Sequence, residues 1–574
     1  MGCERQLRGL RGLGVVRALA VAVVLWACAG LTVTPAHGQV VTETTSISYG
    51  TQENPWGFGW PIAVTGPWVF VGARNHRDAL GHSSGLSRMG QVYAFRRTTN
   101  GWLRTQTFSP LSNSGRAAFG WHRIACEGSV LVIGDSLDGA AAFECGAVHI
   151  FQEAHGIWTH RQSVSHPRSQ PSSAFGARVD FDGSSLIVGA PGDSSRGANA
   201  GAVFVYRSDA SGVFTLEAEL FGQNLPGMAQ SGSPIFFGMN VAIDDGVAVV
   251  GSRVRGGVVT VFERLGGNWV ERLDIQRPFP FYDARFGWHG LDVSGDWIAI
   301  GSPVEYEPSI PDFGRVFLYT RDAQSPSGWS YVENLTASNG YTSWTGSDEF
   351  GYAVQMRGDR MLVGAQSGRA GPHNRPLGQA HLFELQNGRW TEVQRLSAQR
   401  FESPAAPATV GRFGTAVAFD GGVMAVGDDV DMLGPNQYGH GQVFLYESVL
   451  GSAHCPGSSP TATLSVTGVA TAALGSLRVR VDHLPGATLA LLGASSVGAA
   501  TPVGPGPGGL PCLSGPTRRL GLFSPSLPFG LTEVVLNLDL PALGVLAGET
   551  WAFQAWSREP AGPATSNAVA LRFE

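Results

Sequence analysis

The sequence predicts an all-β protein, a seven-bladed β-propeller followed by a small β-sandwich. Three observations support this fold class. One pattern of short strands and turns recurs seven times, each copy begins with a Phe-Gly pair, and the composition changes after Glu447. Gly supplies 79 of the 574 residues and only 15% of residues are charged, which suits many short strands joined by tight turns.

Residues 1–38 are predicted to be a signal peptide that is cleaved after Gly38. Four arginines precede an apolar run from Ala18 to Val33, and Ala36 and Gly38 are small residues at the two positions that a signal peptidase reads. The run is too short to favour a spanning helix, and no transmembrane segment is expected after signal removal. A lipid anchor on Cys28 is the alternative. The protein is therefore expected to be secreted or displayed on the cell surface.

The Phe-Gly pairs recur 49 to 64 residues apart, a period that indicates a repeat architecture. The pairs are Phe58-Gly59, Phe119-Gly120, Phe175-Gly176, Phe237-Gly238, Phe286-Gly287, Phe350-Gly351 and Phe413-Gly414. A second Gly follows each pair, at Gly72, Gly134, Gly189, Gly251, Gly301, Gly364 and Gly427. The ten residues before this Gly align without a gap and turn in their middle, as at Asp182-Gly183. They predict a β-hairpin, whose strands we name A and B.

Two further strands complete each repeat. Strand C follows a loop of variable length, and strand D starts at an aromatic residue with an apolar residue six positions later, as in Trp158 and Val164. The seventh copy lacks strand D after Tyr446. Counting back from Phe58 places the missing strand at Val41 to Ile47, and closure there would leave no bare sheet edge. Residues 39–448 are therefore predicted to form a propeller that its N-terminal strand closes.

The Phe-Gly pairs and the Gly189-Ala190-Pro191 mark resemble the FG-GAP repeats of integrin α-subunit propellers, and bacterial FG-GAP repeat proteins more closely. The resemblance covers about residues 40–447. It implies a seven-bladed propeller used in adhesion, scaffolding or, less often, catalysis. The calcium-binding loops of integrin-type repeats have no counterpart here. Connections such as Asp180-Phe181-Asp182-Gly183 offer too few oxygen ligands, and their Asp residues are expected to form the turns.

The B–C and D–A loops share one face of the propeller and vary in length, so binding residues are expected there. Their polar residues include Arg74, His76, Arg77, Asp135, Asp138, Asp193, Arg196, Glu305 and Asp312. The cluster of Asp428, Asp429 and Asp431 is the candidate metal site, with a solvated loop as the alternative. The pairs Trp121-His122 and Trp288-His289 are interpreted as packing groups at bulged strand starts.

The sequence contains no H-E-x-x-H motif and no paired Cys/His, and we expect no enzyme, no catalytic residue and no cofactor. A net charge of −6 makes nucleic acid an unsuitable partner. The favoured function is a non-enzymatic exported or surface protein that presents a propeller face to a protein or glycan partner. The alternatives are a secreted hydrolase or lyase with a site in the central channel and a structural component of an envelope or matrix.

Residues 449–574 are predicted to form a β-sandwich of seven short strands separated by Pro/Gly-rich links. The stretch from Gly548 to Arg558 resembles the end of a C-terminal module in large exported proteins of environmental bacteria.

Four cysteines remain after signal removal. Cys455 and Cys512 are predicted to form a disulfide in the C-terminal module. Cys126 and Cys145 are predicted to stay free, and Cys126 is expected to be a small apolar core residue at the position that Val64 has in the first copy. Strand B separates their two strands by about 9–10 Å, and a disulfide needs Cα atoms within about 7 Å.

Overall fold

The structure is a computed structural model that describes most of the propeller and seven strands after it. The described ranges are 41–48, 56–76, 89–98, 101–112, 117–222, 234–277, 285–304, 314–338, 348–370, 375–398, 411–420, 422–429, 441–448, 463–467, 476–482, 490–496, 518–523, 533–539, 550–559 and 562–572. The predicted signal peptide and the predicted Cys455–Cys512 disulfide lie outside these ranges. Within them, no helix has the length and apolar character needed to cross a membrane.

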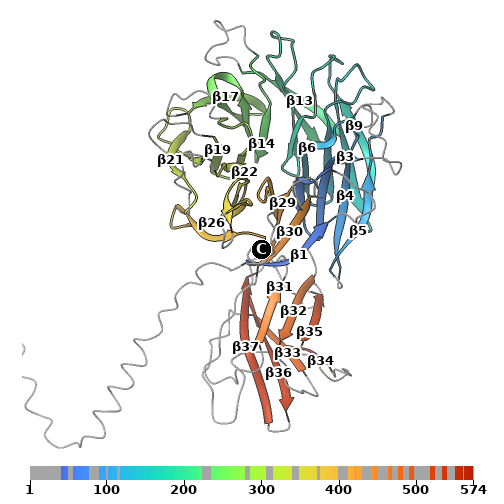
Figure 1. The fold of residues 1–574 in the computed structure, drawn as a ribbon, viewed down its shortest axis with the longest axis vertical. Coiled ribbons are helices and arrows are strands. Elements are labelled where there is room, and N and C mark those ends of the chain that lie inside the picture. Colours follow the sequence, from blue (N-terminus) through green and yellow to red (C-terminus); the bar gives the residue numbers. More distant parts are fainter. Residues whose placement is uncertain are drawn as a thin grey trace, which may run out of the picture. The chain divides into compact units, whose positions relative to one another are not determined.

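Seven four-stranded antiparallel sheets form the blades (Figure 1). Blades one to three contain β2 (Trp56–Thr65), β3 (Trp68–His76), β4 (Met89–Thr98) and β5 (Gly101–Phe108); β6 (Phe119–Glu127), β7 (Val130–Asp135), β8 (Ala147–Ala154) and β9 (Ile157–Ser165); and β10 (Arg178–Phe181), β11 (Ser185–Ala190), β12 (Ala202–Ser208) and β13 (Phe214–Leu220). Each set follows the predicted order of strands A, B, C and D.

Blades four to six have the same strand order. They contain β14 (Asn240–Asp244), β15 (Val247–Ser252), β16 (Val258–Leu265) and β17 (Asn268–Gln276); β18 (Leu291–Ser294), β19 (Trp297–Ser302), β20 (Arg315–Arg321) and β21 (Trp329–Leu335); and β22 (Phe350–Arg357), β23 (Arg360–Ala365), β26 (Gln379–Gln386) and β27 (Arg389–Leu396). The described parts of the B–C loops contain two small elements, the 3-10 turn η1 (Val254–Gly256) and the hairpin of β24 (Arg369–Ala370) and β25 (Arg375–Pro376).

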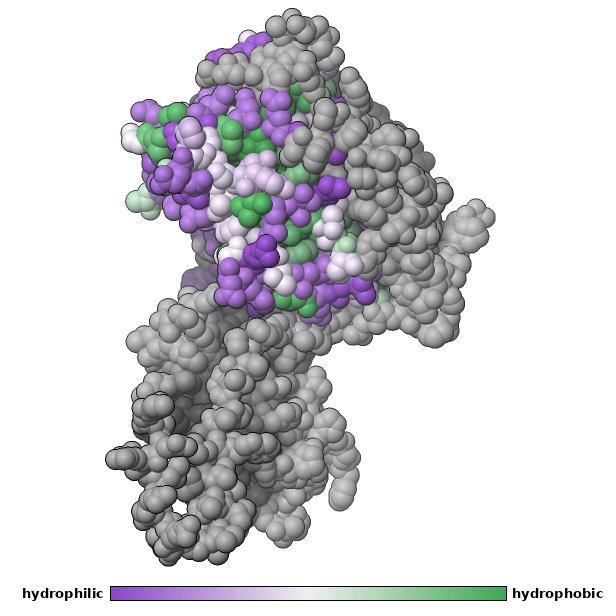
Figure 2. All heavy atoms as spheres, turned by 90° about the vertical axis from the view of Figure 1, so that its left-hand side faces the viewer, coloured by the Kyte–Doolittle hydropathy of each residue, from purple (hydrophilic) through white to green (hydrophobic). Residues whose placement is uncertain are grey.

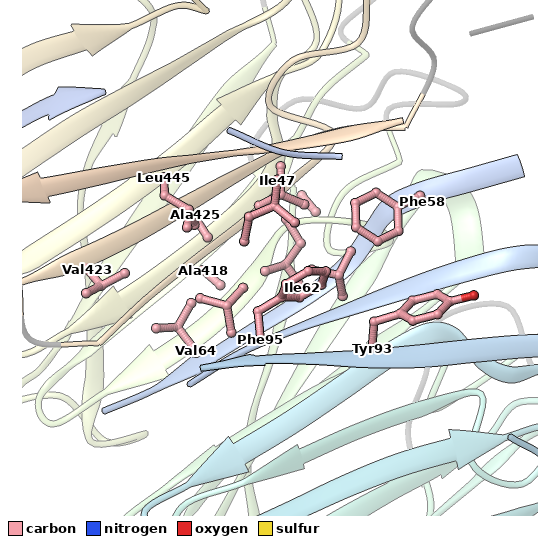
Figure 3. Close-up of a cluster of buried hydrophobic side chains, with 14 of the residues drawn as sticks. Ile47, Phe58, Ile62, Val64, Tyr93, Phe95, Ala418, Val423, Ala425 and Leu445 are labelled. Carbon is pink, nitrogen blue, oxygen red and sulfur yellow. The ribbon is translucent and has the colours of Figure 1, made fainter. Parts of the chain in front are cut away.

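The N-terminal strand closes blade seven, as predicted. The blade contains β28 (Ala416–Asp420), β29 (Val423–Asp428), β30 (Gln442–Ser448) and, as its outermost strand, β1 (Val41–Ser48). β1 runs antiparallel to β30, with Val41 opposite Ser448 and Ile47 opposite Val443. Figure 1 shows the blue β1 beside the orange β30. Ile47 is 6% exposed and belongs to the same buried cluster as Phe58 of blade one and Leu445 of blade seven (Figure 3).

The two sequence marks of the repeat form the contact between successive blades. Each Phe of the seven pairs is at most 1% exposed. The Gly that ends strand B lies against the Gly of the next Phe-Gly pair, so that a Cβ on Gly134 would lie 2.1 Å from the carbonyl oxygen of Gly176. The contact recurs between every pair of neighbouring blades, including Gly427 and Gly59 where the ring closes. Any side chain at this position would push two blades apart, which explains why all seven copies have Gly there.

The inner strands of neighbouring blades contact one another all round the ring, from β2 to β28 and back to β2. Because side chains alternate along a strand, one set enters the buried clusters between blades and the other set faces a central channel. The inner strands therefore place seven short rows of side chains around one space.

Among the described residues, seven strands follow the propeller. They are β31 (Thr463–Thr467), β32 (Ser476–Asp482), β33 (Ala490–Ser496), β34 (Arg518–Phe523), β35 (Glu533–Asp539), β36 (Thr550–Glu559) and β37 (Gly562–Arg572). They pair into a sheet of β31, β32 and β35 and a sheet of β34, β33, β36 and β37. The β-sandwich itself stays a prediction.

Cys126 and Cys145 are free, which confirms the prediction for this pair. Cys126 lies on β6 opposite Leu131, Cys145 precedes β8, and β7 lies between these two strands. Cys145 is buried. Cys126 is only half-buried and packs at the edge of a cluster that contains Ile124, so it is less enclosed than the core position that its alignment with Val64 predicts.

Candidate functional site

The central channel encloses a cavity of about 270 Å³ that is lined by the inner strands of all seven blades. The repeat stacks the inward side chains in layers, because the inner strands share one register relative to strand B. One layer contains Arg123 and Arg178, the next contains Asp180, Asp292 and Gln355, and the last, at the A–B turns, is mainly acidic. The channel is thus cationic near the starts of the inner strands and anionic near their ends.

The acceptors of the middle layer connect neighbouring blades. Asp180 Oδ2 accepts a hydrogen bond from the backbone N–H of Ile243 at 2.9 Å, and Asp292 Oδ2 accepts one from Met356 at 2.5 Å. Further bonds of this type link Gln355 with Phe419, Asp244 with Gly295, Ser294 with Gly358, and Asp420 with Gly66. Every donor belongs to the blade that follows the acceptor. These side chains therefore satisfy the free N–H groups of the inner edge strands, which is a structural role.

Burial keeps the middle layer partly protonated. Together with the charge of Asp180, it raises the pKa of Asp292 to about 8. Burial also raises the pKa of Asp180. At neutral pH the middle layer carries less negative charge than its composition suggests.

The cationic end of the channel is built on aromatic rings. The guanidinium of Arg74 lies 3.0 Å from the centre of the Trp60 ring, and the ring of His289 is stacked on Tyr352 at 4.5 Å. His122 meets the edge of Trp60 at 6.1 Å. Arg178 and three of these residues lie on four inner strands, Arg74 lies at the end of β3, and His289 lies just before β18. We call Trp60, Arg74, His122, Arg178, His289 and Tyr352 the channel mouth.

The charges of the channel mouth come from its arginines. Burial lowers the pKa of Arg74 and of Arg178 to about 10, so both stay protonated at neutral pH. Burial, together with the charge of Arg178, lowers the pKa of His122 and of His289 to about 3, so both imidazoles are neutral. The mouth thus presents two guanidinium groups beside neutral rings, an arrangement that suits an anion with several acceptor oxygens, such as a carboxylate or a sulfate group.

The predicted loop residues lie in different environments. Asp138 and Asp193 are buried within their B–C loops, and each accepts a hydrogen bond from a backbone N–H two residues later. Arg196 lies over the ring of Phe221 at 3.9 Å. Arg74 contributes to the channel mouth. Four of the candidates cannot be placed, because Arg77, Glu305 and Asp312 lie outside the described ranges and the side chain of His76 is not described.

The predicted metal site of blade seven is described only in part, because Asp431 lies outside the described ranges. Asp428 is fully buried and its Oδ1 accepts a hydrogen bond from the backbone N–H of Arg412 at 2.8 Å. Asp429 is 8% exposed and lies 3.9 Å from the Arg412 guanidinium. The metal prediction for these three residues stays untested.

The Trp-His pairs have two roles. Trp288 is buried and packs beneath the Arg253 guanidinium at 4.9 Å, as the packing interpretation predicts. The two histidines instead line the channel cavity. The sequence analysis did not predict this placement. His122 and His289 are the only histidines directly before or within an inner strand, and this position could have indicated that they line the channel.

Seven four-stranded blades around a channel define a seven-bladed β-propeller. The model of the FG-GAP repeat family matches residues 158–206 and 329–383, so the propeller carries FG-GAP repeats. Each match runs from strand D of one blade to strand C of the next, the phase in which β1 serves as the first strand D. No curated protein matches the chain.

Proposed function

We propose that the protein is an exported or cell-surface binding protein whose channel mouth holds an acidic group of a protein or glycan partner. The FG-GAP propeller fold suggests binding and is typically non-catalytic. The predicted signal peptide, residues 1–38, supports export. The predicted sandwich of residues 449–574 would then serve as the module that attaches the propeller at a surface.

The observation that carries this proposal is the incomplete pairing of the two mouth arginines. Arg74 Nε is buried and has no hydrogen-bond partner among the described residues. Arg178 donates from Nη1 to the carbonyl oxygen of its neighbour Ala177 at 3.0 Å. Within the described part of the chain, no carboxylate forms an ion pair with either guanidinium. The charge of Asp429 raises the pKa of Arg74, but Asp429 does not pair with it directly. A partly buried cation without a direct counterion is costly, and an anionic ligand would supply the missing partner.

The outer surface supports a polar mode of binding. Figure 2 shows the side of the propeller that carries β17, β21 and β26, where small apolar patches are separated by polar ones. Exposed apolar side chains on this side, such as Val270 and Tyr331, are 40% and 46% exposed and lie on different blades. This side therefore offers no broad apolar docking face within the described residues.

A binding screen tests the proposal. The purified full chain is probed with uronate-containing and sulfated polysaccharides, their neutral counterparts, and acidic and neutral peptides. We expect acidic probes to bind and neutral ones not to bind. The double variant Arg74→Gln/Arg178→Gln should weaken binding roughly 10- to 100-fold, the loss expected for charge-assisted hydrogen bonds. Arg161→Gln is the matched control, because Arg161 is an exposed arginine on β9. Equal binding of neutral probes, or full affinity in the double variant, would contradict the proposal.

The alternative of a hydrolase or lyase requires a channel carboxylate that is free to act on a substrate. The Oδ2 atoms of Asp180 and Asp292 instead accept hydrogen bonds from the next blade. This arrangement favours the structural role of both residues and hence the binding function.

A further inference from the structure

Blade two contains a compact group of three potential metal ligands away from the channel. Asp135 ends β7, Asp138 lies in the B–C loop, and His149 lies on β8. One ligand atom from each residue can be chosen so that all three atoms lie within 4.8 Å of one another. The three residues are 0%, 2% and 3% exposed, respectively. We call them the blade-two cluster.

Each member of the blade-two cluster has one atom fixed by the surrounding protein and one atom open to the cluster. Asp135 Oδ1 accepts a hydrogen bond from the backbone N–H of Ala118 at 2.6 Å, and Asp138 Oδ1 accepts one from the backbone N–H of Ala140 at 2.7 Å. Nδ1 of His149 is hydrogen-bonded to the hydroxyl of Ser163 at 2.8 Å. Such outer contacts are typical of metal ligands, because they fix the orientation of the donor atoms.

Two of the three open atoms lack a hydrogen-bond partner within the described part of the chain. Among the described residues, neither Asp135 Oδ2 nor His149 Nε2 has a hydrogen-bond partner, although both atoms are fully buried. Asp138 Oδ2 lies 3.9 Å from His149 Nε2, which is too far for a hydrogen bond. Two buried carboxyl groups therefore face an imidazole nitrogen, and no arginine of the described residues pairs with them. Buried polar atoms of this kind normally require a partner.

Blade three shows how the same loop is completed when the protein supplies the partner. Asp193 corresponds to Asp138, because the two residues make the same hydrogen bonds. The backbone N–H of each donates to the carbonyl oxygen three residues earlier, and the side chain of each accepts a hydrogen bond from the backbone N–H two residues later. Asp193 Oδ2 accepts hydrogen bonds from His166 at 2.7 Å and Arg168 at 3.1 Å. Phe204 stands at the strand position of His149. Blade two thus has an additional ligand and lacks the cationic partner.

We propose that the blade-two cluster binds one divalent transition-metal ion, with Zn²⁺ as the preferred ion and Asp135, Asp138 and His149 as its ligands. One imidazole and two carboxylates match the ligand types of zinc, whereas calcium takes six to eight oxygens. Ligands around one zinc lie about 3.3 Å apart, so binding draws donor atoms that lie up to 4.8 Å apart together by up to about 1.5 Å. The ion would fasten the loop from Asp135 to Gly146 onto β8. Because the cluster is buried, the metal enters as this loop opens or as the blade folds.

Metal titration of the full chain tests this proposal. The purified protein is treated with a chelator, and then Zn²⁺ or Co²⁺ is added and followed by calorimetry and visible absorption. We expect one zinc per chain, a rise in melting temperature of several degrees, and the intense visible bands of low-coordinate cobalt. An excess of Ca²⁺ should not compete.

Two variants at equivalent positions of strand C show whether zinc binds at the blade-two cluster or at another histidine. His149→Phe installs the residue found at this position in blade three and should weaken zinc binding by more than about 100-fold, since a direct ligand is lost. His381→Phe makes the same change in blade six, where His381 instead contacts Glu392, and should bind zinc like the wild type. Zinc binding that survives in His149→Phe would overturn the proposal. If that variant does not fold, a wild-type chain with no zinc-dependent rise in melting temperature and no cobalt bands would overturn it as well.

Discussion

Removing the side chain of Ile47 should weaken the whole propeller, because this residue anchors the strand that closes the ring. Ile47 is 6% exposed and lies between blade seven and blade one in the cluster shown in Figure 3. Ile47→Ala deletes three buried carbon atoms. At about 0.8 kcal/mol for each buried methylene, the transfer cost is about 2.4 kcal/mol, and the remaining cavity raises the loss to about 3 kcal/mol.

Urea unfolding followed by tryptophan fluorescence measures this loss. Ile157→Ala is the matched control, since Ile157 is 61% exposed and lies on β9, the strand D of blade two. The control should change the free energy of unfolding by no more than about 0.5 kcal/mol. If both variants unfold at the same urea concentration, β1 does not complete blade seven in solution, and the reasoning from the register of β1 and β30 fails.

Three further predictions concern single sites. Gly134→Ala should cost about 3 kcal/mol in thermal unfolding, because it forces two blades apart, whereas Gly128→Ala, with open space around it, should cost about 1 kcal/mol. In the folded chain Asp292 keeps its proton until the pH rises through about 8, whereas in the unfolded chain it loses the proton near its ordinary pKa of about 4, so wild-type stability should fall between these values and Asp292→Asn should flatten the fall in a pH series of melting curves. A Cys455–Cys512 disulfide should contribute roughly 4 kcal/mol, and an unchanged intact mass after reduction would exclude it.

The number of blades, their strand order and the closing strand could be predicted from the sequence because the marks of the repeat arise from local steric needs. Gly134 and its counterparts have no room for a side chain, so the residue is the same in every copy and the copies can be aligned. That alignment also located strand D and, by its absence after Tyr446, the strand β1.

The channel mouth could not be predicted, because it is assembled from blades that are far apart in the sequence. Arg178 and His289 belong to different repeats, and only the closed ring brings them to the same cavity. From the sequence, the Asp residues of the A–B connections are all expected to form the turns. Asp182 does form such a turn, whereas Asp244 reaches the next blade. This difference depends on the spacing between blades, which the sequence does not encode locally.

Only two of the three residues of the blade-two cluster could be recognised from the sequence. Asp135 and Asp138 were candidate loop residues, and they align with Asp428 and Asp431 of blade seven. His149 was hidden in an apolar strand 11 residues after Asp138. A comparison of the copies column by column would have singled out blade two as the copy with both carboxylates and a histidine.

The closure of blade seven also determines how the propeller bears mechanical load. The chain continues into residues 449–574 from Ser448, the last residue of β30. β30 is paired on one edge with β29 and on the other with β1. A pull through residue 449 acts along β30 and must slide two ladders of hydrogen bonds at once, so the bonds share the force. A pull on Val41 would load only one ladder. If residues 449–574 tether the propeller, a force applied by a partner at the channel mouth would therefore act on β30, the strand that is paired on both edges.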